Sequence, residues 1–308
     1  MPSAQTFEPT PIGAVAEWDR LSAGGEFDAQ LSQLAAMHAR SALFDLYGDY
    51  LRPRGGVAPV AALVRLLAPI GIAAPAVRTA VSRMVQQGWL QPARVANGPG
   101  YAITPKAARR LDETAVRVYR TEPAKWDGHF DLIVLELPAG RAERNRLSGD
   151  LTFLGYATIG SGTWVAARHN DEVDDLLKDA GVSCERFHAS HAGDSAGASA
   201  LVQRAWDLGA VAEAYRRFVR DLRPVVTAVG PDSSDEQAYT ARFALVHAWR
   251  AFLFRDPQLP PSLLPSRWPG TSAAEFFDAH AARLRRPADR HVDRSLELVS
   301  TPVKGGMP

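Results

Sequence analysis

Residues 76–90 read AVRTAVSRMVQQGWL, and the polar and apolar residues of this stretch follow a helical period. At about 100° per residue, the hydrogen-bond donors fall on one side of a helix and the apolar side chains on the other. The polar side consists of Arg78, Thr79, Ser82, Arg83 and Gln86, and the apolar side consists of Val77, Ala80, Val81, Met84 and Val85. A solvated helix face usually carries Glu and Lys, whereas this face has no acidic residue and presents groups that suit phosphates and base edges. The stretch therefore predicts an amphipathic helix whose outer face fits nucleic acid.

The segments on either side of this helix predict a winged helix-turn-helix. Upstream, the pattern indicates one helix from Met37 to the region of Gly48 and a second over residues 57–71. Downstream of Gly88, WLQPARV and YAIT are typical of two strands joined by a turn at residues 97–100. In a winged helix the third helix enters the major groove, and the hairpin lies against the backbone or the minor groove.

The charge of the chain is unevenly distributed. Residues 37–120 hold 12 Arg and Lys against 4 Asp and Glu, a local net charge of +8, so the remainder is −7 because the whole chain is +1. A basic module beside an acidic remainder favours a polyanionic partner for the module. The alternative is a winged helix that contacts another protein.

This reasoning assigns DNA contacts to two groups of residues. We expect base contacts in the major groove from Arg78, Thr79, Ser82 and Arg83. We expect Arg94 and Asn97 on the wing, with Lys106 near its base, to hold phosphates.

The middle of the chain predicts a ferredoxin-like domain. FDLIVLELP, ATIGSG, TWVAARH and SCERFHA read as strands, and RAERNRLSGDLTFLGY and NDEVDDLLKDAG read as helices. Their order is β-α-β-β-α-β, which is the split β-α-β unit. We expect this domain to serve dimerisation.

The C-terminal part is predicted to be helical from about residue 195 to 290. Its aromatic residues recur at three- and four-residue spacing, which is typical of a core. Alternatively, some of them line an effector pocket with an arginine for an anionic group; the candidates are Trp206, Tyr215, Trp249 and Arg250. A proline-rich run at 257–269 predicts an extended segment that carries Trp268 across the helices.

The predicted fold class is α+β with several domains. We expect a tail or short helix at 1–36, the winged helix-turn-helix at 37–121, the ferredoxin-like domain at 122–192, an all-α domain at 193–294 and a tail at 295–308. The single cysteine, Cys184, excludes an intramolecular disulfide and predicts a small buried side chain. The absence of a signal-like or membrane-spanning stretch predicts a cytoplasmic protein.

Three blocks of the sequence together resemble the PaaX-like family of bacterial repressors of phenylacetate catabolism. The first comprises SALFDLYGDYL, AVRTAVSRMVQQGWL and YAITPKAARRL, the second WDGHFDLIVLELP with RNRLSGDLTFLGYATIGSGTWVA, and the third DPQLPPSLLPSRWPG. They occur in the family's order over roughly residues 37–290, outside the first 35 residues. The resemblance implies a homodimeric repressor that binds double-stranded DNA. An aryl-acetyl-coenzyme A thioester is then expected to release the repressor from its operator.

The family's central domain is similar to small CRISPR-associated endoribonucleases, which offers an enzymatic alternative. Those nucleases hold a metal with an aspartate at the end of the first strand, where this sequence has Glu136. Pro138 and the lack of a second nearby carboxylate argue against a nuclease. His169 with Asp171, and His188 with His191, have spacings that occur in metal sites, but we expect solvent-exposed histidines.

The sequence thus predicts a ligand-responsive transcriptional regulator, a repressor that binds an inverted repeat as a homodimer. We expect no enzymatic activity, cofactor, bound metal or membrane partner. The operator, the regulated genes and the effector are not identified by any motif.

Overall fold

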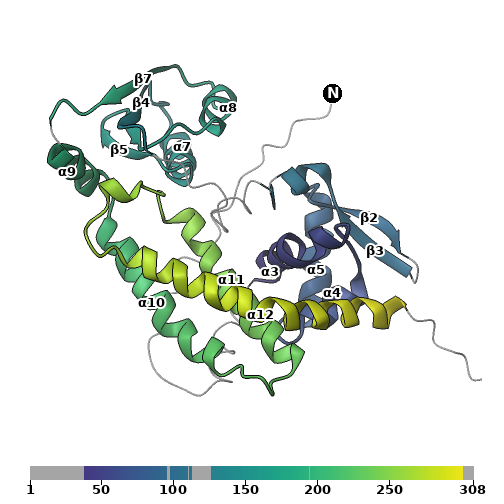
Figure 1. Cartoon of the computed structure of the whole chain (residues 1–308). Helices are drawn as coiled ribbons and strands as arrows, with labels where there is room; N and C mark the ends of the chain where they lie inside the picture. Colours follow the sequence, from purple (N-terminus) through teal and green to yellow (C-terminus); the bar gives the residue numbers. More distant parts are fainter. Residues whose placement is uncertain (1–37, 96–97, 110, 113–125, 194, 301–308) are drawn as a thin grey trace, which may run out of the picture. The chain divides into compact units, whose positions relative to one another are not determined.

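A computed structural model describes residues 38–95, 98–109, 111–112, 126–193 and 195–300. The chain divides into two compact units, and each is described by itself (Figure 1). Unit 1 comprises residues 1–115, 222–251 and 279–308, and unit 2 comprises residues 116–221 and 252–278. The predicted N-terminal tail and Asn97 lie outside the described residues. The three-domain division expected from the sequence stays a prediction.

The N-terminal part of unit 1 contains the three predicted helices. They are α3 (Ala39–Leu46), α4 (Val60–Leu67) and α5 (Ala74–Gln86), and α3 continues through a π-helical turn at Tyr47–Leu51 (η2) and a 3-10 turn at Arg52–Arg54 (η3). Pro75 stands in the first turn of α5, where its missing N–H costs no hydrogen bond. The helix stops before Gly88, whose φ of +70° lies in the left-handed region that favours glycine.

A three-stranded antiparallel sheet completes this part of unit 1. Its strands are β1 (Val57–Pro59), β2 (Leu90–Val95) and β3 (Gly98–Ile103), in the order β1-β3-β2. The β2–β3 hairpin was predicted, but β1 was assigned to the second helix, because three residues are too few to show a strand period. Gly100 permits the close approach of β1 to β3, since a Cβ atom there would lie 2.9 Å from the carbonyl oxygen of Ala58.

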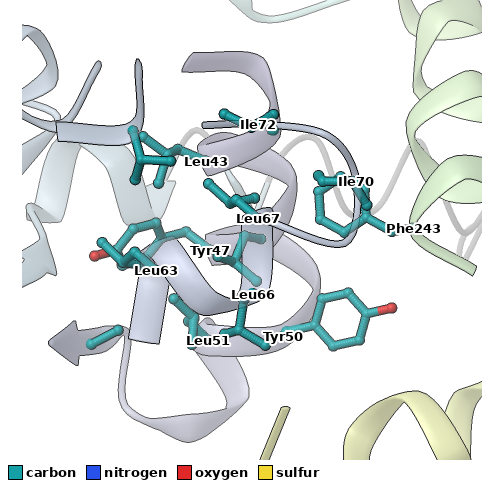
Figure 2. Close-up of a cluster of buried hydrophobic side chains, with 14 of the residues drawn as sticks. Leu43, Tyr47, Tyr50, Leu51, Leu63, Leu66, Leu67, Ile70, Ile72 and Phe243 are labelled. Carbon is teal, nitrogen blue, oxygen red and sulfur yellow. The ribbon is translucent and has the colours of Figure 1, made fainter. Parts of the chain in front are cut away.

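The core of unit 1 joins residues that are far apart in the sequence. Side chains of α3, α4 and α5 pack with Tyr239 and Phe243 of α11 (Asp235–Arg250) and with Ala288 and Val292 of α12 (Pro269–Ser300). Figure 2 shows Phe243 at the edge of the cluster formed by the N-terminal helices. Tyr239 also donates a 2.9 Å hydrogen bond from its hydroxyl to the carbonyl of Leu66. The N-terminal helices therefore complete their core with C-terminal ones.

A buried ion pair connects the same elements. Arg242 of α11 is only 2% exposed and forms a salt bridge with Asp49, which lies in the π-helical turn after α3. The Arg242 guanidinium also donates to the hydroxyl of Tyr50 at 2.9 Å and to the carbonyl of Ala281 at 3.1 Å. Arg285 of α12 binds the other carboxylate oxygen of Asp49 at 3.2 Å. These partners satisfy charges whose burial alone would be unfavourable.

A second buried carboxylate repeats this arrangement one turn earlier. Asp45 of α3 lies 2.5 Å from Nδ1 of His247 and 3.0 Å from a guanidinium nitrogen of Arg250. Both partners belong to the last turn of α11. Asp45 and Asp49 together hold one face of α3 and its extension against the C-terminal helices.

Unit 2 contains a four-stranded antiparallel sheet with the predicted order of strands and helices. The elements are β4 (His129–Leu135), α7 (Arg141–Phe153), β5 (Ala157–Gly160), β6 (Thr163–Ala166), α8 (Glu172–Asp179) and β7 (Cys184–Ser190). The strand order is β5-β6-β4-β7. One face of the sheet packs on α7 and α8 through residues such as Ile133 and Leu147, and the other meets α9 (Ser195–Ala205) through Phe130 and Val165. Cys184 is exposed on β7, so the expectation of a buried thiol was wrong.

The C-terminal region is helical, as predicted, with α10 (Leu208–Thr227) between α9 and α11. The proline-rich run includes a 3-10 turn at Pro261–Leu263, and Gln258 and Arg267 in this run have positive φ angles of 53° and 63°. Helix α12 accommodates Pro287 and continues to Ser300, beyond residue 294, where the helical domain was expected to end. Among the described residues, no helix is both long and apolar enough to cross a membrane.

Unit 1 contains a buried and an exposed carboxylate that each pair with an arginine, and the comparison gives a stability prediction. We expect Asp49→Asn to lower the free energy of unfolding by about 3–5 kcal/mol, because it leaves the buried Arg242 charge without its counterion. Asp112→Asn is the matched control, since Asp112 pairs with Arg52 but its side chain is 54% exposed, and we expect a loss below about 1 kcal/mol. Urea denaturation followed by circular dichroism measures both. Equal losses would show that burial does not set the strength of these pairs.

Candidate nucleic-acid interface

Helix α5 has the two faces that its sequence predicts. Val77, Ala80, Val81 and Met84 are buried in the core of unit 1. Arg78, Thr79, Ser82 and Arg83 are all exposed. Because packing fixes the apolar face, the four polar side chains project from a rigid support, which suits them to contact a partner.

Burial removes both carboxylates of residues 38–107 from the surface. Residues 38–107 contain eight Arg and Lys but only two acidic residues, Asp45 and Asp49. Both aspartates are buried and paired with basic residues of the C-terminal helices. The exposed surface of this segment is therefore more basic than its composition indicates, and it repels no phosphate through a carboxylate of its own.

Six of the eight basic residues of this segment fall into two groups. Arg52 pairs with Asp112, Arg54 binds Asp293 at 2.6 Å, and Arg65 donates to the carbonyl of Ser295 at 3.4 Å. In contrast, no carboxylate among the described residues pairs with Arg78, Arg83 or Arg94. The first group has structural partners, whereas the second remains available for a ligand.

The base of the hairpin is connected to the end of α5. Thr104 donates from its hydroxyl to the carbonyl of Gly88 at 2.7 Å and accepts from the N–H of Ala107 at 3.2 Å. Lys106 is exposed, and its ammonium group lies 4.8 Å from the centre of the Trp89 ring. These contacts connect the base of the hairpin to the end of α5, so that Arg94 on β2 and the polar face of α5 belong to one packed module.

The predicted effector residues are distributed over both units. Trp206 and Tyr215 lie in unit 2, where Trp206 belongs to a buried cluster and Tyr215 donates its hydroxyl hydrogen bond to Asp256. Trp249 and Arg250 lie in unit 1. Trp249 is buried, and Arg250 pairs with Asp45, so the described contacts give these side chains structural roles.

Sequence reasoning missed a cavity in unit 1. It has a volume of about 640 Å³, and its lining comes from the end of α10, the following loop, α11 and α12. The basic groups of this lining belong to α12: they are His280, Arg283, which donates to the carbonyls of Val229 and Val226, and Arg290, which pairs with Asp235 at 2.6 Å. Burial and the neighbouring Arg283 lower the pKa of His280. In the sequence, His280 and Arg283 are three positions apart and Arg283 and Arg290 are seven apart. This spacing places the three basic side chains on one helix face and could have indicated the site.

The candidate groups in unit 2 have separate surroundings. Glu136 is exposed just after β4, and within the described residues no group of three metal-ligating side chains includes it. His169, His188 and His191 are exposed, as expected. His169 lies 2.7 Å from Asp171 but does not approach either of the other two closely enough to form a common ligand set in the described part.

The fold and the surface define a multidomain α+β protein with a basic helix-and-hairpin module. Sequence models match residues 38–107 as PaaX-like protein, residues 123–201 as the PaaX protein central Cas2-like domain, and residues 206–294 as the PaaX-like protein C-terminal domain. The chain belongs to the PaaX-like family.

Two similar proteins illustrate the relationship. The chain is 28% identical over 244 residues to the transcriptional repressor PaaX of Escherichia coli (strain K12), an alignment that covers 77% of each protein. The solved structure of the uncharacterized protein Rv0674 from Mycobacterium tuberculosis superposes with a TM-score of 0.59 at 22% identity, covering 83% of this chain and 99% of the other. The second similarity supports the fold alone.

Substitutions on the two faces of α5 are expected to differ in their effect on the free energy of unfolding. We expect Arg78→Ala and Arg83→Ala to change the free energy of unfolding by less than about 0.5 kcal/mol, because both side chains are exposed. The control is Met84→Ala on the buried face, which should cost about 2–5 kcal/mol. Denaturant titrations measure all three. A loss above about 1 kcal/mol for either arginine variant would mean that it holds the fold rather than a ligand.

Proposed function

We propose that this protein is a DNA-binding transcriptional repressor whose reader is α5 with the β2–β3 hairpin. The observation that carries the proposal is the exposed surface of residues 38–107, which has unpaired arginines on α5 and β2 and no exposed carboxylate. The similar Escherichia coli protein is a transcriptional repressor by name, which supports the same function.

The proposed contacts follow from the arrangement of the module. Three helices followed by a hairpin, with a short β1 closing the sheet, support a winged helix-turn-helix. In that arrangement Arg78, Thr79, Ser82 and Arg83 read base edges in the major groove. Arg94 binds a phosphate beside it, and we assign the same role to Asn97 and Lys106.

We further propose a homodimer that binds an inverted repeat. A symmetric dimer presents two recognition helices to two half-sites, so operator symmetry reflects protein symmetry. The β-α-β-β-α-β order and antiparallel sheet of unit 2 support a ferredoxin-like domain, which we assign to dimerisation.

An anionic effector is the proposed signal for release from DNA. The cavity in unit 1 supports this assignment, because Arg290 in its wall, which pairs with Asp235 at 2.6 Å, can exchange that carboxylate for a phosphate or carboxylate of the ligand. Family membership favours an aryl-acetyl-coenzyme A thioester. The cavity volume of about 640 Å³ falls within the range of small-molecule sites.

Fluorescence anisotropy with labelled duplexes tests the reader. The full-length protein is titrated against duplexes from upstream of its own gene and against scrambled duplexes, at several salt concentrations. We expect Arg78→Ala to cost about 1–3 kcal/mol of binding and to relax sequence preference, and Arg94→Ala to reduce the salt slope by about one. Arg216→Ala is the control, because Arg216 is an exposed arginine of α10 far from the module in sequence. If the variants bind DNA like the wild type, α5 and β2 do not contact DNA. That result would favour a module that contacts another protein.

A second titration tests the effector cavity. Aryl-acetyl-coenzyme A thioesters are added to the protein–DNA complex, with free coenzyme A as the reference ligand. We expect Arg290→Ala to raise the thioester concentration for half-release by about tenfold, the value of one charge-assisted hydrogen bond of about 1.5 kcal/mol. Arg294→Ala is a close control, since Arg294 also pairs with Asp235 at 2.6 Å but does not line the cavity. If both variants respond like the wild type, the effector binds elsewhere.

A further inference from the structure

Three potential metal ligands converge at one end of the sheet in unit 2. Asp127 precedes β4, His129 begins β4, and His188 lies on β7. One ligand atom from each residue lies within 4.8 Å of the others. None of these residues belongs to the proposed DNA interface or to the effector cavity.

Backbone pairing brings the two histidines together. Strands β4 and β7 lie side by side, and their antiparallel register places His129 opposite Ser190 and Asp131 opposite His188 (Figure 1). His129 and His188 are therefore diagonal neighbours on one face of the sheet. Their rings are stacked with centroids 4.3 Å apart. Two strands thus hold both imidazoles in place.

Local hydrogen bonds orient the carboxylate toward these rings. One oxygen of Asp127 accepts a 2.9 Å hydrogen bond from the backbone N–H of His129, and the other lies 3.1 Å from Nε2 of His188. The indole of Trp126 donates to the carbonyl of His129 at 2.8 Å and braces the start of the strand.

The partners of the Asp127 carboxylate differ from those of Asp131, the next aspartate along the chain. Asp131 forms two hydrogen bonds with Arg186, which neutralises its charge. Among the described residues, no arginine or lysine pairs with Asp127, and the side chains that its carboxylate contacts are the imidazoles of His129 and His188. A carboxylate with two imidazoles at the solvent boundary is the donor set that zinc and related ions prefer, and a third imidazole or water completes such sites.

We propose that Asp127, His129 and His188 bind one divalent transition-metal ion of the zinc class. The ion is coordinated by one carboxylate and two imidazoles, with its remaining position open to solvent. It connects the segment that enters β4 with the edge strand β7. The separation of 61 residues between Asp127 and His188 explains why the sequence shows no ligand spacing.

Isothermal titration calorimetry with zinc chloride tests the site. The full-length protein is expressed without a histidine tag, treated with a chelator and desalted before titration. We expect one equivalent of zinc to bind, and Asp127→Asn, His129→Ala and His188→Ala each to weaken binding by at least about tenfold. His38→Ala is the matched control, because His38 is exposed and belongs to unit 1.

Cobalt(II) gives an independent readout of the same site. We expect visible absorption bands of a four- or five-coordinate ion with the wild type and with His38→Ala, and their loss in the three ligand variants. Circular dichroism confirms that each variant is folded. The proposal is overturned if the wild type binds no zinc, or if the ligand variants bind zinc and cobalt as tightly as His38→Ala does.

Discussion

The buried salt bridge between Asp49 and Arg242 is the interaction on which the architecture of unit 1 depends. It joins residues 193 positions apart and brings the π-helical turn after α3 onto α11. Buried ion pairs contribute little net stability compared with apolar packing, but they penalise strongly any arrangement that separates the charges. The pair therefore selects one position of α3 on the C-terminal helices. The shared core around Tyr239 and Phe243 then supplies the favourable burial energy.

This arrangement also determines the charge of the outer surface. Asp45 and Asp49 face inward, where arginines of α11 and α12 neutralise them and His247 contacts Asp45. The acidic residues thus stabilise the interior of unit 1, while the arginines of α5 and β2 face solvent. One set of buried contacts both positions the helix and removes the groups that would repel a polyanion.

Local patterns predicted the parts of the fold that depend on local physics. The two faces of α5 and its end at Gly88 follow from side-chain periodicity and backbone preference, and β4 of unit 2 follows from its apolar run. The sequence did not reveal the role of Asp45 and Asp49, because an aspartate is ordinarily exposed and its partners lie in another part of the chain. The grouping of His129 with His188 was missed for the same reason, since strand pairing creates it and spacing does not show it.

The cavity and the buried charges of unit 1 share two helices. Helix α11 contributes Arg242 to the charge network and Ala238 to the cavity wall, and α12 contributes Arg285 to the network and Arg283 to the wall. A ligand that changes the spacing of α11 and α12 would therefore act on the guanidinium groups that hold α3. Because close-packed cores shift between discrete arrangements rather than deforming continuously, such a change would move α3 together with α5, which shares its core. This contact chain would connect a ligand among the C-terminal helices to the orientation of α5, the helix that we propose reads DNA.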